Sequence, residues 1–150
     1  MKNTQLLLAV MVLFCSCSKG TAPEESHLGK WKLMNIALAH RYNNGILFQQ
    51  PILDFSKDSI VFEFKKDNIL MVSEDIMSHT ALNQIAEHGV PSFFSQFQKG
   101  TNVYSIEYRG ITLALKTENL TFDLLISNNG SKMKLGVIGA GGYHLEKVEK

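Results

Sequence analysis

The chain has 150 residues, of which 45% are hydrophobic and 19% charged. This composition fits one globular domain and excludes both a long disordered polypeptide and two domains of normal size. The formal net charge is only +1, and the cations are scattered, so no nucleic-acid partner is expected.

The first 16 residues have the parts of an export signal. Lys2 gives a positive start, and residues 6–14 form an apolar run of nine. A membrane-spanning helix needs roughly 20 apolar residues, so this run fits the core of a secretory signal instead. Both cysteines of the chain, Cys15 and Cys17, follow the run, and a disulfide between residues only two apart would be strained.

Cys17 follows the small residue Ser16, whereas Cys15 follows Phe14. The segment therefore resembles a bacterial lipoprotein signal that is cleaved before Cys17, although Phe14 stands where leucine is usual. A plain cleaved signal and an uncleaved anchor are the alternatives. The resemblance implies that Cys17 carries the lipid, and several acyl chains at ~0.8 kcal/mol per buried CH₂ hold a protein stably at a membrane.

The expected location is the cell envelope, and the expected partner of the lipid is a membrane. Ser18 directly after the cysteine resembles the preference for the outer membrane, and the periplasmic and surface faces both stay open. Residues 17–26 are polar and predict a short lipidated tether before a domain over 27–150. Removing residues 1–16 takes away Lys2 and no acid, so 14 cations and 14 acids remain.

Apolar residues alternate with polar ones along most of this domain, which predicts β-strands. We expect an all-β fold with eight antiparallel strands joined mainly by short turns. Eight strands in up-and-down order can close into a barrel and so remove the free edges of the sheet. The predicted strands cover 28–38, 59–64, 69–73, 103–108, 111–116, 120–126, 132–137 and 143–148.

Two segments interrupt the alternation. Residues 39–58 predict a long loop with a short strand near 46–48. Residues 78–98 predict a short helical insertion, in which Gly89 ends a first helix and Pro91 begins a second. This insertion lies between the third and fourth predicted strands, where it can cover one mouth of the barrel.

The opening Gly29-Lys30-Trp31 resembles the Gly-x-Trp start of lipocalins and of lipocalin-like domains in bacterial lipoproteins. The ending, residues 142–148, is similar to the closing strand of that family. The resemblance implies an eight-stranded barrel with Trp31 at its closed end. Typical lipocalins stack an arginine of the last strand on this tryptophan, whereas this chain offers Lys147 there, so no ligand specificity is carried over.

A barrel of eight strands is either filled by its side chains or holds one small ligand. We expect a pocket for a small apolar or amphipathic molecule, and the alternative is that the same aromatic residues form a core. The candidate lining residues are Trp31, Phe62, Phe64, Phe93, Phe97, Tyr104, Tyr108 and Phe122.

The remaining residues offer little catalytic chemistry. The five histidines form no metal-binding motif, and no Gly-x-Ser-x-Gly motif occurs, so neither a metal, a cofactor nor an enzyme is expected. The leading function is ligand binding by an envelope-anchored barrel. The alternative is a solid barrel that serves as a structural, interaction or inhibitor module for another envelope protein. Asp58-Ser59-Ile60 resembles an O-glycosylation acceptor of some bacterial envelopes.

Overall fold

The structure is a computed structural model of the chain. It describes residues 25–38, 40–41, 47–48, 52–80, 82, 92–109, 112–127 and 129–149. The expected signal peptide, Cys17 and most of the expected tether lie outside the described residues.

The described strands form one large antiparallel sheet and one small one. The small sheet pairs β2 (His40–Arg41) with β3 (Leu47–Phe48). The large sheet holds ten strands, which are β1 (Gly29–Leu38), β4 (Ile52–Asp54), β5 (Val61–Lys65), β6 (Ile69–Val72), β7 (Gly100–Val103), β8 (Ser105–Arg109), β9 (Thr112–Lys116), β10 (Thr121–Ile126), β11 (Lys132–Val137) and β12 (Gly141–Lys147).

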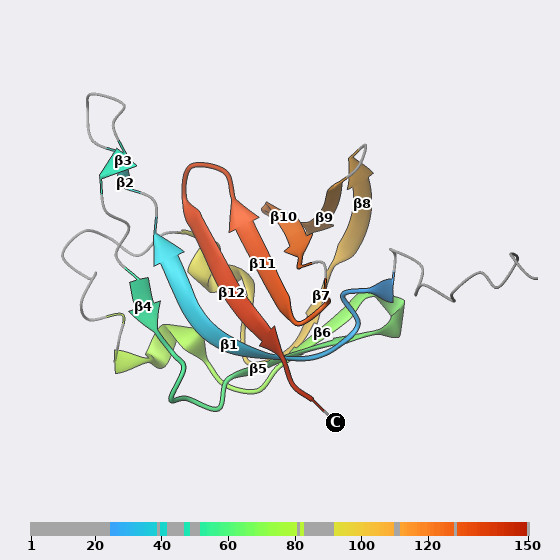
Figure 1. Ribbon diagram of the computed structural model, residues 1–150, viewed down its shortest axis with the longest axis horizontal. Coiled ribbons are helices and arrows are strands. Elements are labelled where there is room, and N and C mark those ends of the chain that lie inside the picture. Colours follow the sequence, from blue (N-terminus) through green and yellow to red (C-terminus); the bar gives the residue numbers. More distant parts are fainter. Residues whose placement is uncertain are drawn as a thin grey trace, which may run out of the picture.

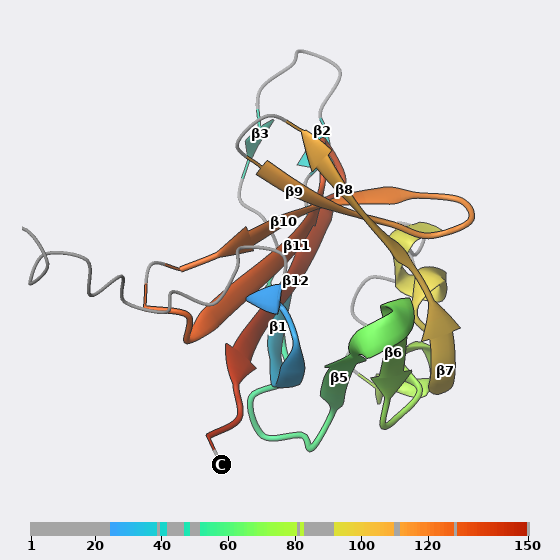
Figure 2. The ribbon, with the colours of Figure 1, turned by 90° about the vertical axis from the view of Figure 1, so that its right-hand side faces the viewer.

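The large sheet curls into a nearly closed barrel (Figures 1 and 2). Its strand order is β7-β6-β5-β1-β12-β11-β10-β9-β8, and β4 pairs with β1 beside this path. The pairing of β1 with β12 joins the first strand of the domain to the last. The two ends of the path, β7 and β8, follow each other in the chain with only Tyr104 between them. The expected all-β antiparallel architecture is therefore confirmed.

The expected number of eight strands is wrong for this sheet. Tyr104 divides the strand predicted at 103–108. Its N–H donates to the carbonyl of Asn68 at 3.0 Å, and this is the last backbone hydrogen bond that the strand makes toward β6 and the turn before it. After Tyr104 the chain pairs with β9 instead. One predicted strand thus becomes β7 and β8, each with a different neighbour.

β4 lies inside the segment predicted as a loop, and it pairs with the same edge of β1 as β5 does. Between them the chain bulges out, with the N–H of Phe55 donating to Met34 at 2.9 Å and the N–H of Leu33 donating to Ile60 at 2.9 Å. The bulge adds residues that have no partners in β1. It breaks the period-two pattern, which is why the alternation did not reveal β4.

The inward face of β1 changes phase part-way along the strand. Trp31 and Leu33 are fully buried, and then Ile36 and Leu38 are buried. The register between β1 and β12 slips between Leu33 and Asn35, which is a bulge that moves the buried positions from odd to even numbers. The strand thereby stays against the core along its whole length.

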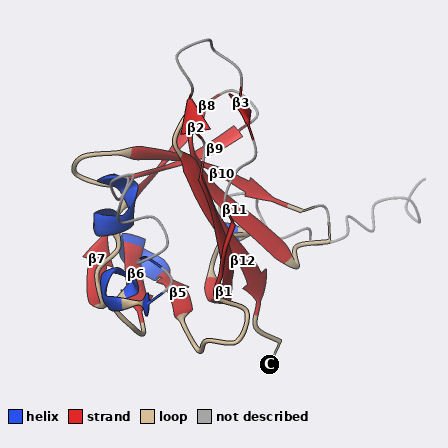
Figure 3. Cartoon of the chain, turned by 90° about the vertical axis from the view of Figure 1, so that its left-hand side faces the viewer, coloured by secondary structure: helices blue, strands red, loops and turns tan. Residues whose placement is uncertain are grey.

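The expected helical insertion is only partly described, and its described part contains 3-10 helices and no α-helix. Three 3-10 helices lie wholly within the described residues, namely η3 (Lys66–Asn68), η4 (Ile76–Ser78) and η7 (Ser92–Gln96). The Asp75 carboxylate caps η4 by accepting the N–H of Met77 at 3.0 Å. Figure 3 shows the helical turns, in blue, beside β5, β6 and β7. Of these helices, η7 buries Phe93 and Phe94.

Gly141 begins β12 with φ +123°, and a Cβ there would overlap the backbone carbonyl of Ala37. We expect Gly141→Ala to lower the free energy of unfolding by about 2–3 kcal/mol, from backbone strain and overpacking together. Gly130 has φ +69° with open space around it, so Gly130→Ala should cost only about 1 kcal/mol. Urea unfolding of both variants measures the difference, and equal losses would contradict the close packing at Gly141.

Candidate functional site

Seven of the eight residues proposed to line a pocket are buried in the barrel interior. Tyr108 is the exception and was wrongly placed in the interior, because its side chain is 48% exposed on β8. Four depressions on the surface of the described residues are lined by other residues. The seven buried residues are Trp31, Phe62, Phe64, Phe93, Phe97, Tyr104 and Phe122.

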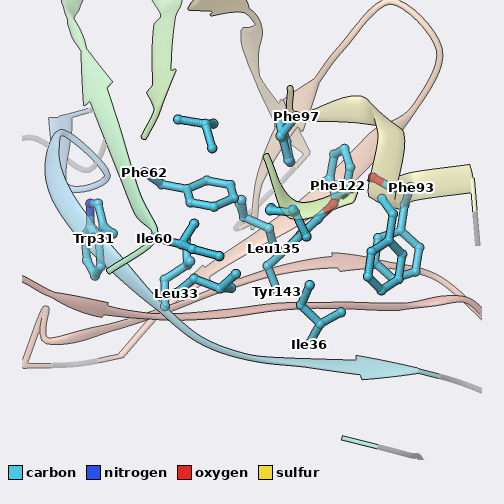
Figure 4. Packing of buried hydrophobic residues seen from close by; sticks show 14 of the residues in the cluster. Trp31, Leu33, Ile36, Ile60, Phe62, Phe93, Phe97, Phe122, Leu135 and Tyr143 are labelled. Carbon is cyan, nitrogen blue, oxygen red and sulfur yellow. Dashed lines mark hydrogen bonds between the residues drawn. The ribbon is translucent and has the colours of Figure 1, made fainter. Parts of the chain in front are cut away.

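The centre of the barrel is filled by aromatic rings (Figure 4). The ring of Phe97 lies 4.9 Å from that of Phe122, 5.7 Å from that of Phe62 and 5.5 Å from that of Tyr143, centroid to centroid. These separations are those of rings in direct contact. Phe97 follows η7 directly, so the segment between β6 and β7 inserts a side chain into the centre of the barrel.

Tyr143 of β12 is a central residue that the sequence analysis did not single out. It is fully buried, and its hydroxyl donates to the carbonyl of Phe93 at 2.7 Å. Burial raises the pKa of the Tyr143 hydroxyl far above its usual range, so the group stays protonated and remains a donor. This bond joins η7 to the last strand, and no sequence pattern relates two residues 50 positions apart.

Trp31 is fully buried near the start of β1. The indole Nε1 donates to the carbonyl of His27 at 2.8 Å. The ammonium of Lys147 lies 5.2 Å from the centroid of the Trp31 ring, which is a cation–π distance. Lys147 of β12 therefore places a cation over the Trp31 ring.

His27 and Tyr104 lie beside Trp31. His27 is 4% exposed, and its Nε2 lies 3.0 Å from the Tyr104 hydroxyl. The ring of Phe64 meets both of them edge to face, with centroids 5.9 Å and 5.7 Å apart. Burial raises the pKa of Tyr104 to about 12, so its hydroxyl is neutral at physiological pH. Together with Trp31, these side chains form a buried, hydrogen-bonded cluster.

Two of the surface depressions lie on the outward face of β10, β11, β12 and β1. Strand register places Leu125, Lys134, His144 and Asn35 in one row across this face. Leu125 is 51% exposed and lines both depressions. The row therefore combines an apolar side chain, a cation, an imidazole and an amide on one accessible surface.

His144 is the titratable group of this row with a perturbed pKa. Its Nε2 is buried and has no hydrogen-bond partner among the described residues. Desolvation, and second the ammonium of Lys134, lower the pKa of His144, so the imidazole is neutral at physiological pH.

This pKa shift predicts a pH dependence of stability. As the pH falls below the ordinary histidine pKa, the unfolded chain takes up the proton of residue 144 before the folded chain does, so the folded state loses stability. Between about pH 7.5 and about pH 5, wild type should therefore lose more free energy of unfolding than His144→Gln. Urea unfolding at the two pH values measures this, and equal losses in the two proteins would contradict the shift.

The described residues include no group of three or more His, Cys, Asp or Glu side chains close enough to hold a metal ion. In the same part of the chain, no helix combines the length and apolar character needed to cross a membrane. Ser59 of the expected glycosylation acceptor is exposed in the bulge before β5, where its hydroxyl donates to Glu74 at 2.9 Å.

Comparison with known proteins adds no relative: no protein-family model, no curated protein and no solved structure matches this chain.

Proposed function

We propose that this chain is a lipid-anchored protein of the bacterial envelope whose barrel binds another envelope protein with its outer surface. The observation that carries the proposal is the filled interior, in which Phe97 and Tyr143 occupy the space that a ligand would need. Of the two functions expected from the sequence, the solid interaction module agrees better with this packing than a carrier of small molecules does.

The outer surface supports the proposal because it carries exposed apolar side chains that line a depression. Leu125 and Ile138 are 51% and 85% exposed, and both line the depression over the glycine backbone of β11 and β12. Interfaces between proteins are built from such apolar side chains beside polar and charged ones. The anchor at Cys17 would hold this surface at a membrane.

Native mass spectrometry of the Cys17→Ala variant, purified from its own host, tests whether the barrel holds a ligand. We expect the mass of the polypeptide alone. A retained apolar or amphipathic molecule would contradict the proposal and support a carrier.

Site-specific photo-crosslinking in the host tests the protein partner. A photoreactive amino acid at position 125 should give a discrete crosslinked protein, because this position lies on the outward face with the two depressions. The matched control is position 77, since Met77 is similarly exposed but lies in η4 beside a different depression. Absence of an adduct at position 125, or the same adduct at both positions, would contradict a specific interaction.

A further inference from the structure

Among the described residues, the strand path of the nearly closed barrel ends in two unpaired edges, one on β7 and one on β8. β8 pairs with β9 along one edge, and no described strand pairs with its other edge. β6 would close the barrel there, but β6 begins at Ile69 and its pairing ends opposite Val103 of β7. Figure 2 shows β8 rising away from β5 and β6. An exposed edge of this kind is a template on which another strand can add.

The direction of the backbone groups of β8 follows from its neighbours. The N–H of Thr117 donates to the carbonyl of Leu120 at 2.9 Å, so odd-numbered residues of β9 point their amides toward β10. Even-numbered residues of β9 must then point theirs toward β8, because successive residues alternate between the two edges. Their partners in β8 are odd-numbered, and Glu107 is the central one.

The amide and carbonyl groups of Ile106 and Tyr108 therefore point to the open edge. The N–H of Tyr104 supports this assignment, because it donates to Asn68 on the side that β8 leaves unpaired. Among the described residues, neither Ile106 nor Tyr108 has a strand partner on that side. The open edge thus presents donors and acceptors in the alternating order of a strand.

The side chains along β8 are arranged so that the strand complements itself. Glu107 and Arg109 precede and follow Tyr108 in the chain, and both are exposed. The Arg109 guanidinium lies 3.2 Å from the Glu107 carboxylate, N to O. In an antiparallel pair of identical strands centred on Tyr108, Glu107 of each copy faces Arg109 of the other. A pair centred on Glu107 would instead place two like charges opposite each other, which is unfavourable.

We propose that β8 is a dimerisation edge, at which a second copy of this chain adds its own β8 in antiparallel order centred on Tyr108. In this register the open-edge groups of the two central tyrosines hydrogen-bond each other, and their rings form a cross-strand pair. The contact is isologous, so a two-fold axis passes between the two copies and the assembly closes at two. The proposal is independent of the proposed interaction with another envelope protein.

Cysteine crosslinking of the full-length chain tests this register. At the centre of the paired strands the Cα atoms of the two residues 108 would lie about 5.5 Å apart, within the range of a disulfide. Tyr108→Cys treated with a mild oxidant should therefore give a disulfide-linked homodimer on a non-reducing gel. Leu125→Cys is the matched control, because Leu125 is 51% exposed but lies away from the edge, and the parent chain controls for Cys15 and Cys17.

Reversal of the charges tests the pairing itself. In the Tyr108→Cys background, Arg109→Glu places glutamates opposite each other at both ends of the contact and should lower the dimer yield about tenfold. Adding Glu107→Arg restores opposite charges in the same register and should restore the yield. Circular dichroism of each variant checks that the barrel is folded. If Arg109→Glu alone is unstable, the variant that also carries Glu107→Arg still tests the pairing.

Equal dimer yields from Tyr108→Cys and Leu125→Cys would show random collision and overturn the proposal. The absence of a dimer would overturn it as well, as would a disulfide to a protein of a different mass. A dimer yield that stays the same after Arg109→Glu would overturn the register centred on Tyr108.

Discussion

Replacing Trp31 with alanine should lower the free energy of unfolding by about 3–5 kcal/mol, the usual cost of removing a large aromatic side chain from a core. Trp31 is fully buried in the hydrophobic core. Its loss also leaves the carbonyl of His27 without the indole donor that now lies 2.8 Å away. Urea unfolding followed by circular dichroism measures the change.

Trp31→Phe separates the packing of the ring from its hydrogen bond. This variant keeps an aromatic body in the site and loses the donor to His27, so it should cost less, about 1–3 kcal/mol. An unchanged free energy of unfolding in Trp31→Ala would contradict the position of Trp31 in the core.

Cys17→Ala should release the protein from membranes entirely, because the predicted acyl chains are attached at that residue and nowhere else. Its unfolding midpoint should equal that of the wild type, since Cys17 precedes the described domain. Fractionation of host cells into membrane and soluble parts measures the release.

Cys15→Ala is the matched control, because Cys15 belongs to the predicted signal and would be removed with it. It should stay in the membrane fraction like the wild type. Membrane retention of Cys17→Ala, or release of both variants alike, would contradict the assignment of Cys17 as the lipidated residue.

The architecture was predictable wherever apolar residues alternate without interruption. Phe122 and Leu124 of β10, and Met133 and Leu135 of β11, are buried at the positions that the alternation predicts. The pattern did not reveal β4, because the bulge after Asp54 adds residues that have no counterpart in β1. Strand counts read from periodicity therefore fail where a strand bends or bulges.

Whether the aromatic residues line a pocket or fill a core was not predictable from the sequence. Alternation places a ring such as Phe62 on the inner face of a sheet, but it does not say what lies across from that face. The answer depends on Phe97, which comes from outside the strands and packs against Phe62 and Tyr143. The hydrogen bond from Tyr143 to Phe93 that holds this segment also links distant parts of the chain.

Binding of benzene distinguishes a filled barrel from a hollow one, because a dry apolar cavity of about 150 Å³ binds benzene, whereas a filled core has no room for it. Phe97→Ala would open such a space among Phe62, Phe122 and Tyr143, all of which contact the Phe97 ring. We expect benzene to shift the NMR signals of these three residues in Phe97→Ala and to leave them unchanged in the wild type. Benzene bound among them in the wild type would instead show that the barrel is hollow.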